Sequence, residues 1–273
     1  MSRSFVRGIW GEFDDSEKHL RRRNGISLRE KVYRDMKLSL VNPYEPKFRV
    51  YVFGSDNYKK VQDMGFEDVK LIDKRPCVWD MKKHIYRHKV EIWNAALKDF
   101  DEVVFLDWDC FPVAKIPKNF WKVMSKGPDL QGALYCYKRR KNHWRRKASR
   151  TVIAATFLYM RGKDMVPEMI RMWKKYKKPW SEESLLMRYW DETNGGWKGV
   201  DYYVDNGFEP IYHTLYSGFQ KDTEFLKTRQ FLFLHCNQKR VRDIMREGDP
   251  KSVKIKLDAL HKNRSQQLLI RNG

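Results

Sequence analysis

The fold is decided by the segment VVFLDWDCFPV, residues 103–113. Its first four residues are apolar and mostly β-branched or aromatic, which predicts a buried parallel strand. Asp107 and Asp109 follow this strand, and Pro112 predicts the end of regular structure. Ligands of open α/β sheets bind in the crevice beyond the carboxyl ends of the strands. We therefore expect the two carboxylates to hold a hard divalent cation or a basic group, although Asp-x-Asp also occurs in plain solvated turns.

The composition indicates a folded globular protein. The chain has 273 residues, of which 41% are apolar and 14% aromatic, enough to bury a sizeable core. No apolar run reaches the ~18 residues of a membrane span, and residues 1–10 lack a signal-peptide pattern, so a cytoplasmic protein is expected. The cysteines lack the Cys-x-x-Cys spacing of a zinc site and are predicted to be free thiols in a reducing compartment. They are Cys77, Cys110, Cys136 and Cys236.

The strongly basic charge indicates an anionic partner. The chain has 56 Lys and Arg against 35 Asp and Glu, a net charge of +21, which attracts polyanions. Double-stranded DNA is the first choice, while acidic glycans, a membrane surface or a merely soluble basic surface remain alternatives. Residues 138–147 include seven Lys or Arg and one Trp, which suit phosphates and base stacking. The predicted DNA-binding residues are Arg139, Arg140, Lys141, Trp144, Arg145 and Arg146, with Lys174 and Lys175 on a basic helix over 165–178.

Apolar runs and turn residues predict an α/β fold with a mixed, mostly parallel sheet flanked by helices. A strand over 48–53, a helix over 58–64 and a strand over 69–72 form a βαβ unit, which implies parallel strands. Further strands are predicted over 5–10, 131–137, 152–160 and 231–234, and further helices over 14–36, 81–97 and from Glu182 onward. We expect one domain over residues 1–250 and a basic helical tail over 251–273.

The helix predicted over 81–97 leads directly into the strand that ends at Asp107. Its apolar stripe at helical spacing also contains Lys89. A positive charge on this stripe either reaches an anion in the same crevice as Asp107 or extends to solvent along the edge of the core.

Three chemical features are expected at the same edge of one sheet. Asp107 and Asp109 end one predicted strand, His235 ends another, and Lys239 follows within a turn. Two carboxylates and an imidazole suit Mn²⁺ better than Mg²⁺, because Mn²⁺ accepts nitrogen ligands more readily. Lys89 and Lys239 would then neutralise a phosphate group that shares the metal. Such a site fits a reaction with a nucleoside diphosphate leaving group.

With these motifs, the chain resembles the metal-dependent glycosyltransferases of the GT-A type, whose fold is Rossmann-like. The resemblance extends from residue 5 to about residue 240. It implies that Asp107 binds the ribose and the metal of a nucleotide sugar, that Asp109 is the direct metal ligand, and that His235 completes the metal shell. It also implies that Lys239 binds the diphosphate. Mn²⁺ or Mg²⁺ is the implied metal, and UDP is the commonest carrier in this family.

The end of the first predicted strand is a second candidate for nucleotide-sugar binding. Gly8 and Gly11 flank Trp10 there, which allows the backbone to approach a ligand closely but fits a plain turn equally well.

The acidic start of the helix at Glu182 resembles the motif that faces the acceptor in this family. In an inverting enzyme such a carboxylate accepts the proton of the acceptor hydroxyl, and Glu183 is our first candidate, with Glu182 second. Both acids also fit a helix start, where they complement the helix dipole. A retaining enzyme has no such base. Further carboxylates remain open as candidates, namely Asp191, Asp201, Asp205 and Asp222.

The charge and the expected cytoplasmic location together suggest an anionic polymer as acceptor. A small basic glycosyltransferase is similar to bacteriophage enzymes that glycosylate hydroxymethylated pyrimidines of DNA, and there the target base must leave the stack. An enzyme of lipopolysaccharide or capsule synthesis is the chief alternative. A non-catalytic nucleic-acid-binding protein and a metal-dependent nuclease are alternatives from other classes.

Overall fold

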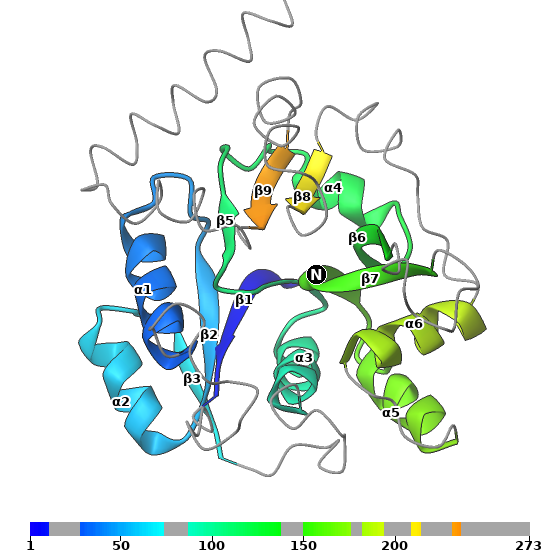
Figure 1. Cartoon of the computed structure of the whole chain (residues 1–273), viewed down its shortest axis with the longest axis horizontal. Helices are drawn as coiled ribbons and strands as arrows, with labels where there is room; N and C mark the ends of the chain where they lie inside the picture. The colour runs from blue at the N-terminus through cyan, green and yellow to red at the C-terminus, as the bar shows by residue number, and fades with distance from the viewer. Residues whose placement is uncertain are drawn as a thin grey trace, which may run out of the picture.

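A six-stranded sheet forms the centre of the computed structural model, which describes residues 1–10, 28–73, 87–137, 150–175, 182–193, 209–213 and 231–235. Its strands are β1 (Arg3–Ile9), β2 (Phe48–Phe53), β3 (Val69–Ile72), β4 (Glu102–Leu106), β6 (Leu130–Tyr137) and β7 (Arg150–Arg161). The strand order is β3-β2-β1-β4-β7-β6 (Figure 1). The first four strands in this order run parallel, whereas β7 is antiparallel to both β4 and β6. The predicted α/β class with a mixed, mostly parallel sheet is therefore confirmed.

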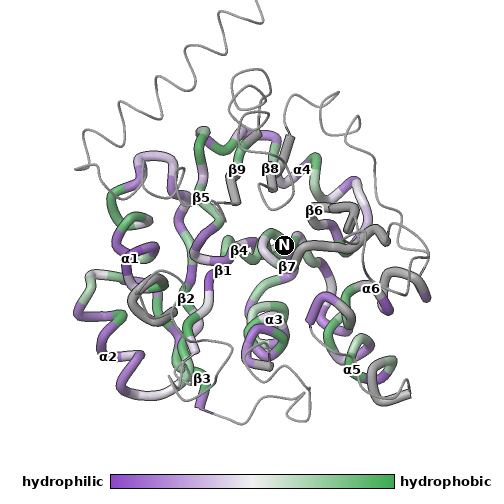
Figure 2. The backbone as a smooth tube through the Cα atoms, viewed as in Figure 1, coloured by the Kyte–Doolittle hydropathy of each residue, from purple (hydrophilic) through white to green (hydrophobic). Residues whose placement is uncertain are grey.

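Helices cover both faces of this sheet. They are α1 (Leu28–Val41), α2 (Ser55–Asp63), α3 (Arg87–Asp99), α4 (Phe120–Ser125), α5 (Met165–Lys175) and α6 (Glu182–Thr193). Helices α3, α5 and α6 share one hydrophobic cluster with one face of the sheet, while α1, α2 and α4 pack on the opposite face. In Figure 2, hydrophobic and hydrophilic residues alternate along α1, α2 and α5, as expected of helices with one buried face. None of the helices within the described residues is long and apolar enough to cross a membrane.

Several predicted helix bounds need correction. Helix α1 ends at Val41, not at residue 36, and α2 begins at Ser55, directly after Gly54, whose φ of 82° suits glycine. The short helix α4 was not predicted. The boundary expected near residue 250 and the predicted tail lie outside the described residues.

A second, three-stranded sheet overturns one further prediction. It consists of β5 (Cys110–Pro112), β9 (Phe231–His235) and β8 (Glu209–His213) in the order β5-β9-β8. Regular structure was predicted to end at Pro112, and Pro112 is the last residue of β5, a short strand that was not predicted. Proline is tolerated there because β5 is an edge strand of its sheet. We had expected His235 to lie in the same sheet as the strand before Asp107. That prediction is wrong, because β9 and β4 belong to different sheets.

The residues of β4 are buried on both faces, as predicted for a central parallel strand. All five are buried, and successive side chains alternate between the two layers. Val103 and Phe105 join the cluster beneath α3, whereas Val104 and Leu106 join the cluster beneath α4 and β9. The same alternation directs the next side chain, that of Asp107, toward α3.

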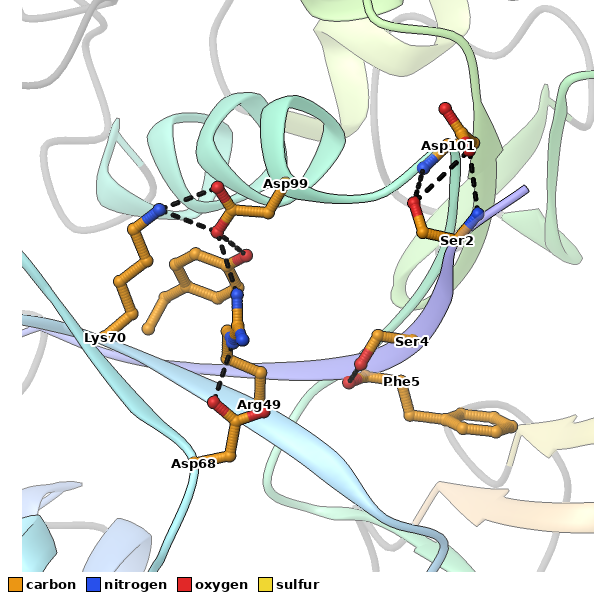
Figure 3. Close-up of polar contacts among 9 residues, drawn as sticks. Ser2, Ser4, Phe5, Arg49, Asp68, Lys70, Asp99 and Asp101 are labelled. Carbon is orange, nitrogen blue, oxygen red and sulfur yellow. Dashed lines mark hydrogen bonds and ion pairs between the residues drawn. The ribbon is translucent and has the colours of Figure 1, made fainter.

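An ion-pair network fixes the carboxyl end of α3 to the sheet (Figure 3). The Asp99 carboxylate accepts hydrogen bonds from Lys70 Nζ at 2.7 Å, Tyr51 Oη at 2.8 Å and Arg49 Nη1 at 3.2 Å. Burial raises the pKa of Asp99, but the hydrogen bonds from Lys70 and Tyr51 outweigh it, so the pKa lies below the ordinary value. The network holds α3 over β2 and β3, and thereby helps to place the residues at the start of α3.

Candidate active site

Lys89 and Asp107 form a partly buried ion pair at the carboxyl end of β4. The Nζ atom of Lys89 lies 2.8 Å from Asp107 Oδ2, and the two side chains are 4% and 19% exposed. Lys89 Nζ also donates to the carbonyl oxygen of Ala155 at 3.4 Å and lies 5.6 Å from the centre of the Phe105 ring. The ammonium group therefore reaches the anion expected in the crevice, and the alternative that it extends to solvent is wrong.

A second carboxylate, that of Glu182, lies near the Lys89 ammonium group. Its Oε1 atom is 3.7 Å from Lys89 Nζ, and its side chain is 5% exposed because the first turn of α6 packs against α3. Burial raises the pKa of Glu182 to about 7; Lys89 opposes this shift, while the charges of Glu183 and Asp107 add to it. Glu183, the next residue, is only partly buried. Of the two acids, Glu183 is thus the one that solvent reaches more easily.

The residues from Asp107 to Cys110 form a tight turn between β4 and β5. Cys110 N donates to the Asp107 carbonyl at 3.0 Å, and Asp107 N donates to the Thr156 carbonyl on β7 at 2.9 Å. Trp108 Nε1 donates to the Gly8 carbonyl at 2.7 Å, so the indole ring is anchored to β1. The turn that carries both carboxylates is therefore tied to two strands of the central sheet.

The buried guanidinium group of Arg7 is a part of the site that sequence reasoning missed. Arg7 lies in the middle of β1 and is fully buried. It donates to the carbonyl oxygens of Asp107 at 2.7 Å and Cys110 at 3.1 Å, and its Nη2 lies 2.6 Å from Glu45 Oε1. Burial raises the pKa of Glu45, and the charge of Arg7 opposes this shift. The available signal was an arginine within an otherwise apolar predicted strand.

Gly8 and Trp10 have packing roles that do not involve a ligand. A Cβ atom at Gly8 would lie 2.2 Å from Ile92 Cδ1 on α3, so the Ile92 side chain would have to shift to make room for any other residue there. Trp10 is 8% exposed, and its ring is nearly parallel to that of His88 at 6.5 Å between ring centres. Their nucleotide-sugar role stays a prediction.

The predicted metal ligands come from the turn and from β9. Asp109 is partly buried and directly precedes Cys110, whose backbone is in register with His235 of β9. His213 on β8 is in turn in register with His235, a neighbour that the sequence did not reveal. Two carboxylates beside an imidazole-bearing strand are a donor set that fits Mn²⁺, with Asp107 Oδ2 already bonded to Lys89. Among the side chains that the structure describes, no group of three possible ligands is close enough to hold a metal.

Several other predicted residues belong to parts of the chain that the structure does not describe. Lys239 and the basic segment 138–147 lie outside the described residues, as do the side chains of His235, Lys174 and Lys175. The DNA-binding prediction is therefore untested. Cys110 is buried and its thiol is not part of a disulfide bond, as predicted for this residue.

The fold and site define an open α/β protein with a charged site in the crevice at the end of a central parallel strand. The chain is similar to mouse xyloside xylosyltransferase 1 in its apo form, with 7% identity, a TM-score of 0.49 and coverage of 87% of this chain and 98% of that one. It is also similar to the apo form of the glycosyltransferase GlyE of Streptococcus pneumoniae TIGR4, with 14% identity, a TM-score of 0.44 and coverage of 96% and 64%.

A third similar structure is the nucleoside-diphosphate-sugar pyrophosphorylase of Vibrio cholerae RC9, with 10% identity, a TM-score of 0.38 and coverage of 74% and 98%. No protein-family model and no curated protein sequence matches this chain. With such identities and TM-scores, the three similarities do not assign an activity.

Proposed function

We propose that the protein is a metal-dependent glycosyltransferase that moves a sugar from a nucleotide sugar, with UDP as carrier, to a hydroxyl group on an anionic polymer. The observation that carries this proposal is the ion pair between the buried Lys89 and the partly buried Asp107, with its 2.8 Å contact at the carboxyl end of β4. It combines a fixed cation with a carboxylate at the place where open α/β sheets bind nucleotides.

Lys89 is proposed to stabilise the leaving diphosphate. In the transfer, the acceptor oxygen bonds to the anomeric carbon while the bond from that carbon to the diphosphate oxygen breaks, which leaves negative charge on the diphosphate. A preorganised ammonium group near this oxygen lowers the barrier, since it needs no reorganisation during the reaction. Lys89 is preorganised because Asp107, Glu182 and the Ala155 carbonyl surround its Nζ atom.

Asp109, Asp107 and His235 are proposed to hold the metal, with Asp109 as the direct carboxylate ligand. When bound, Mn²⁺ or Mg²⁺ supplies positive charge that neutralises the two phosphates of the donor. The Asp107 carboxylate already accepts a hydrogen bond from Lys89. A role in binding the ribose, or outside the direct ligand shell of the metal, therefore suits Asp107. Gly8, Trp10 and Lys239 complete the proposed nucleotide-sugar site.

Glu183 remains the proposed base of an inverting reaction, in which its carboxylate accepts the proton of the acceptor hydroxyl. A base must come within hydrogen-bonding reach of that proton. Glu182 is 5% exposed and faces Lys89, so a role in holding the Lys89 ammonium group suits it better. Glu183 is partly exposed one residue further along α6.

The proposed acceptor is a hydroxymethylated pyrimidine base in double-stranded DNA, modified in the cytoplasm of a bacteriophage-infected host. The net charge of +21 and the basic segment that contains Trp144 support this choice. Replacing Arg139, Arg140, Arg145 and Arg146 by glutamate should weaken binding to DNA and flatten its salt dependence. An unchanged salt slope would exclude this segment as the DNA-binding surface.

The test of the proposed function is calorimetric titration of UDP with and without Mn²⁺. The wild-type protein should bind UDP in a Mn²⁺-dependent way, and Asp109→Ala should lose that dependence. Asp63→Ala removes an exposed carboxylate of α2 and is the matched control. If the wild type binds no nucleoside diphosphate under either condition, the glycosyltransferase proposal is wrong.

A further inference from the structure

Nearly all N–H groups of the Arg7 guanidinium donate hydrogen bonds to two partners, the Glu45 carboxylate and the turn from Asp107 to Cys110. Its Nε and Nη2 atoms donate to Glu45 Oε1 at 3.1 and 2.6 Å, and Nη1 and Nη2 donate to the carbonyl oxygens of Asp107 and Cys110 at 2.7 and 3.1 Å. The guanidinium carbon also lies 5.3 Å from the centre of the Phe48 ring and 5.0 Å from that of Trp108. The group is therefore held on its edge by polar atoms and on its faces by aromatic rings.

The two carbonyl groups that Arg7 binds belong to the first and last residues of the turn. Cys110 N also donates to the Asp107 carbonyl at 3.0 Å, so Arg7 reinforces the hydrogen bond that closes the turn. Trp108 supplies a second tie, from its indole nitrogen to Gly8. Because both ends of a four-residue turn are fixed, the directions in which Asp107 and Asp109 leave the backbone are fixed as well.

This set of hydrogen bonds requires the guanidinium group of arginine, and a positive charge alone does not provide it. The planar guanidinium fork presents N–H groups in fixed directions and can bridge a carboxylate and two carbonyl groups at once. Lysine presents a compact ammonium group on a flexible stem and cannot make the same set of bonds. A buried ion pair is by itself weak support for stability, since apolar side chains of similar volume often replace such pairs without loss.

We propose that Arg7 is a positioning residue, which holds the Asp107–Cys110 turn so that the carboxylates of Asp107 and Asp109 are preorganised for the divalent ion of the donor. This inference rests on the proposed function. Arg7 does not contact the ion in this arrangement and acts through the backbone of the turn. Loss of partners that orient metal ligands typically lowers metal affinity ~10–100-fold, and we expect a loss in this range for Arg7→Lys.

The experiment measures Mn²⁺ affinity by electron paramagnetic resonance, in which the six-line signal of free Mn²⁺ diminishes on binding, with saturating UDP present. The wild type, Arg7→Lys and Trp108→Phe are compared at a temperature well below the melting temperature of each. Arg161→Lys is the control, because Arg161 also joins a backbone carbonyl, that of Ser125 at 2.6 Å, to a carboxylate. The backbone of Arg161 is in register with that of Glu102, at the end of β4 opposite to Asp107.

The expected result is that Arg7→Lys binds Mn²⁺ at least tenfold more weakly than the wild type while Arg161→Lys binds it unchanged. Equal affinity of a folded Arg7→Lys variant and the wild type would overturn the positioning role and leave the proposed function intact. If Arg7→Lys does not fold, Trp108→Phe decides, because it removes the second tie of the same turn; wild-type affinity there overturns the inference. A wild type that binds no Mn²⁺ with UDP would overturn both proposals.

Discussion

Replacing Glu182 by glutamine should stabilise the folded protein at neutral and alkaline pH, although it removes a negative charge beside Lys89. Burial raises the pKa of Glu182 from its ordinary value of 4.5 to about 7; Lys89 opposes this shift, and Glu183 and Asp107 add to it. The folded protein thus binds the proton of Glu182 more tightly than the unfolded chain does. Stability must then fall as pH rises between these two values, because deprotonation favours the unfolded chain.

The size of the effect follows from the two pKa values. At about 1.4 kcal/mol for each pKa unit, the raised pKa of Glu182 lowers the free energy of unfolding by about 3 kcal/mol above pH 7. At pH 5 the loss is about 1 kcal/mol, because there only the unfolded chain is largely ionised at this residue. Glutamine has no proton to lose and escapes this change. The free energy of unfolding of Glu182→Gln, relative to the wild type, should therefore grow by about 2 kcal/mol between pH 5 and pH 8.

The assay is urea unfolding followed by tryptophan fluorescence at pH 5, 6, 7 and 8, with a chelator present to keep the protein free of metal. Glu192→Gln, which changes an exposed glutamate of the same helix, is the matched control and should show a difference from the wild type that does not vary with pH. A difference for Glu182→Gln that stays constant or becomes smaller as pH rises would refute the reasoning. Attraction to Lys89 would then outweigh burial.

Three further outcomes are expected. Gly8→Ala should lower the free energy of unfolding, measured in urea, by about 1–3 kcal/mol, because the added methyl group overpacks the core. Adding Ile92→Val removes the Cδ1 atom that this methyl group would meet, so the double variant should regain part of the lost stability. Because the pKa of Asp99 is lowered, its contribution to stability is present above pH 3.8 and is lost as pH falls through its folded pKa. The melting temperatures of wild type and Asp99→Asn, which differ at pH 7, should therefore converge in acid. Lys89→Met should weaken Mn²⁺-dependent UDP binding ~10–100-fold in calorimetry, whereas Lys98→Met, an exposed change on the same helix, should not; equal effects would contradict a specific role for Lys89.

The long strands could be predicted from the sequence because local patterns define them. The bounds of β2 and β3 agree with the prediction, since each apolar run is closed by residues that favour turns or solvent. The strand β5 could not be found in this way. It has three residues, includes Pro112, and pairs with residues 233–235, which are more than a hundred positions further along the chain. No local pattern contains information about so distant a partner.

The site shows the same division between local and tertiary information. The contact of Lys89 with Asp107 could be anticipated, because a helix with a lysine on its buried stripe leads directly into the strand before the aspartate. The distinction between Glu182 and Glu183 could not, since both begin α6 and only packing against α3 shows which is buried. Arg7 was missed because its partners, Glu45 and the turn at residues 107–110, lie elsewhere in the sequence.

The pairing of β5 with β9 also has a consequence for synthesis of the protein. The ribosome completes all six strands of the central sheet, of which β7 is the last in the chain, before it reaches residue 231, where β9 begins. The emerging chain can therefore form the central sheet before β9, the strand that pairs with β5, has been synthesised. Domains generally fold as units during synthesis, and contacts of long sequence separation form late. The carboxylate turn would then gain its neighbouring strand among the last events of translation, and a nascent chain stalled before residue 231 would carry Asp109 without the strand that bears His235.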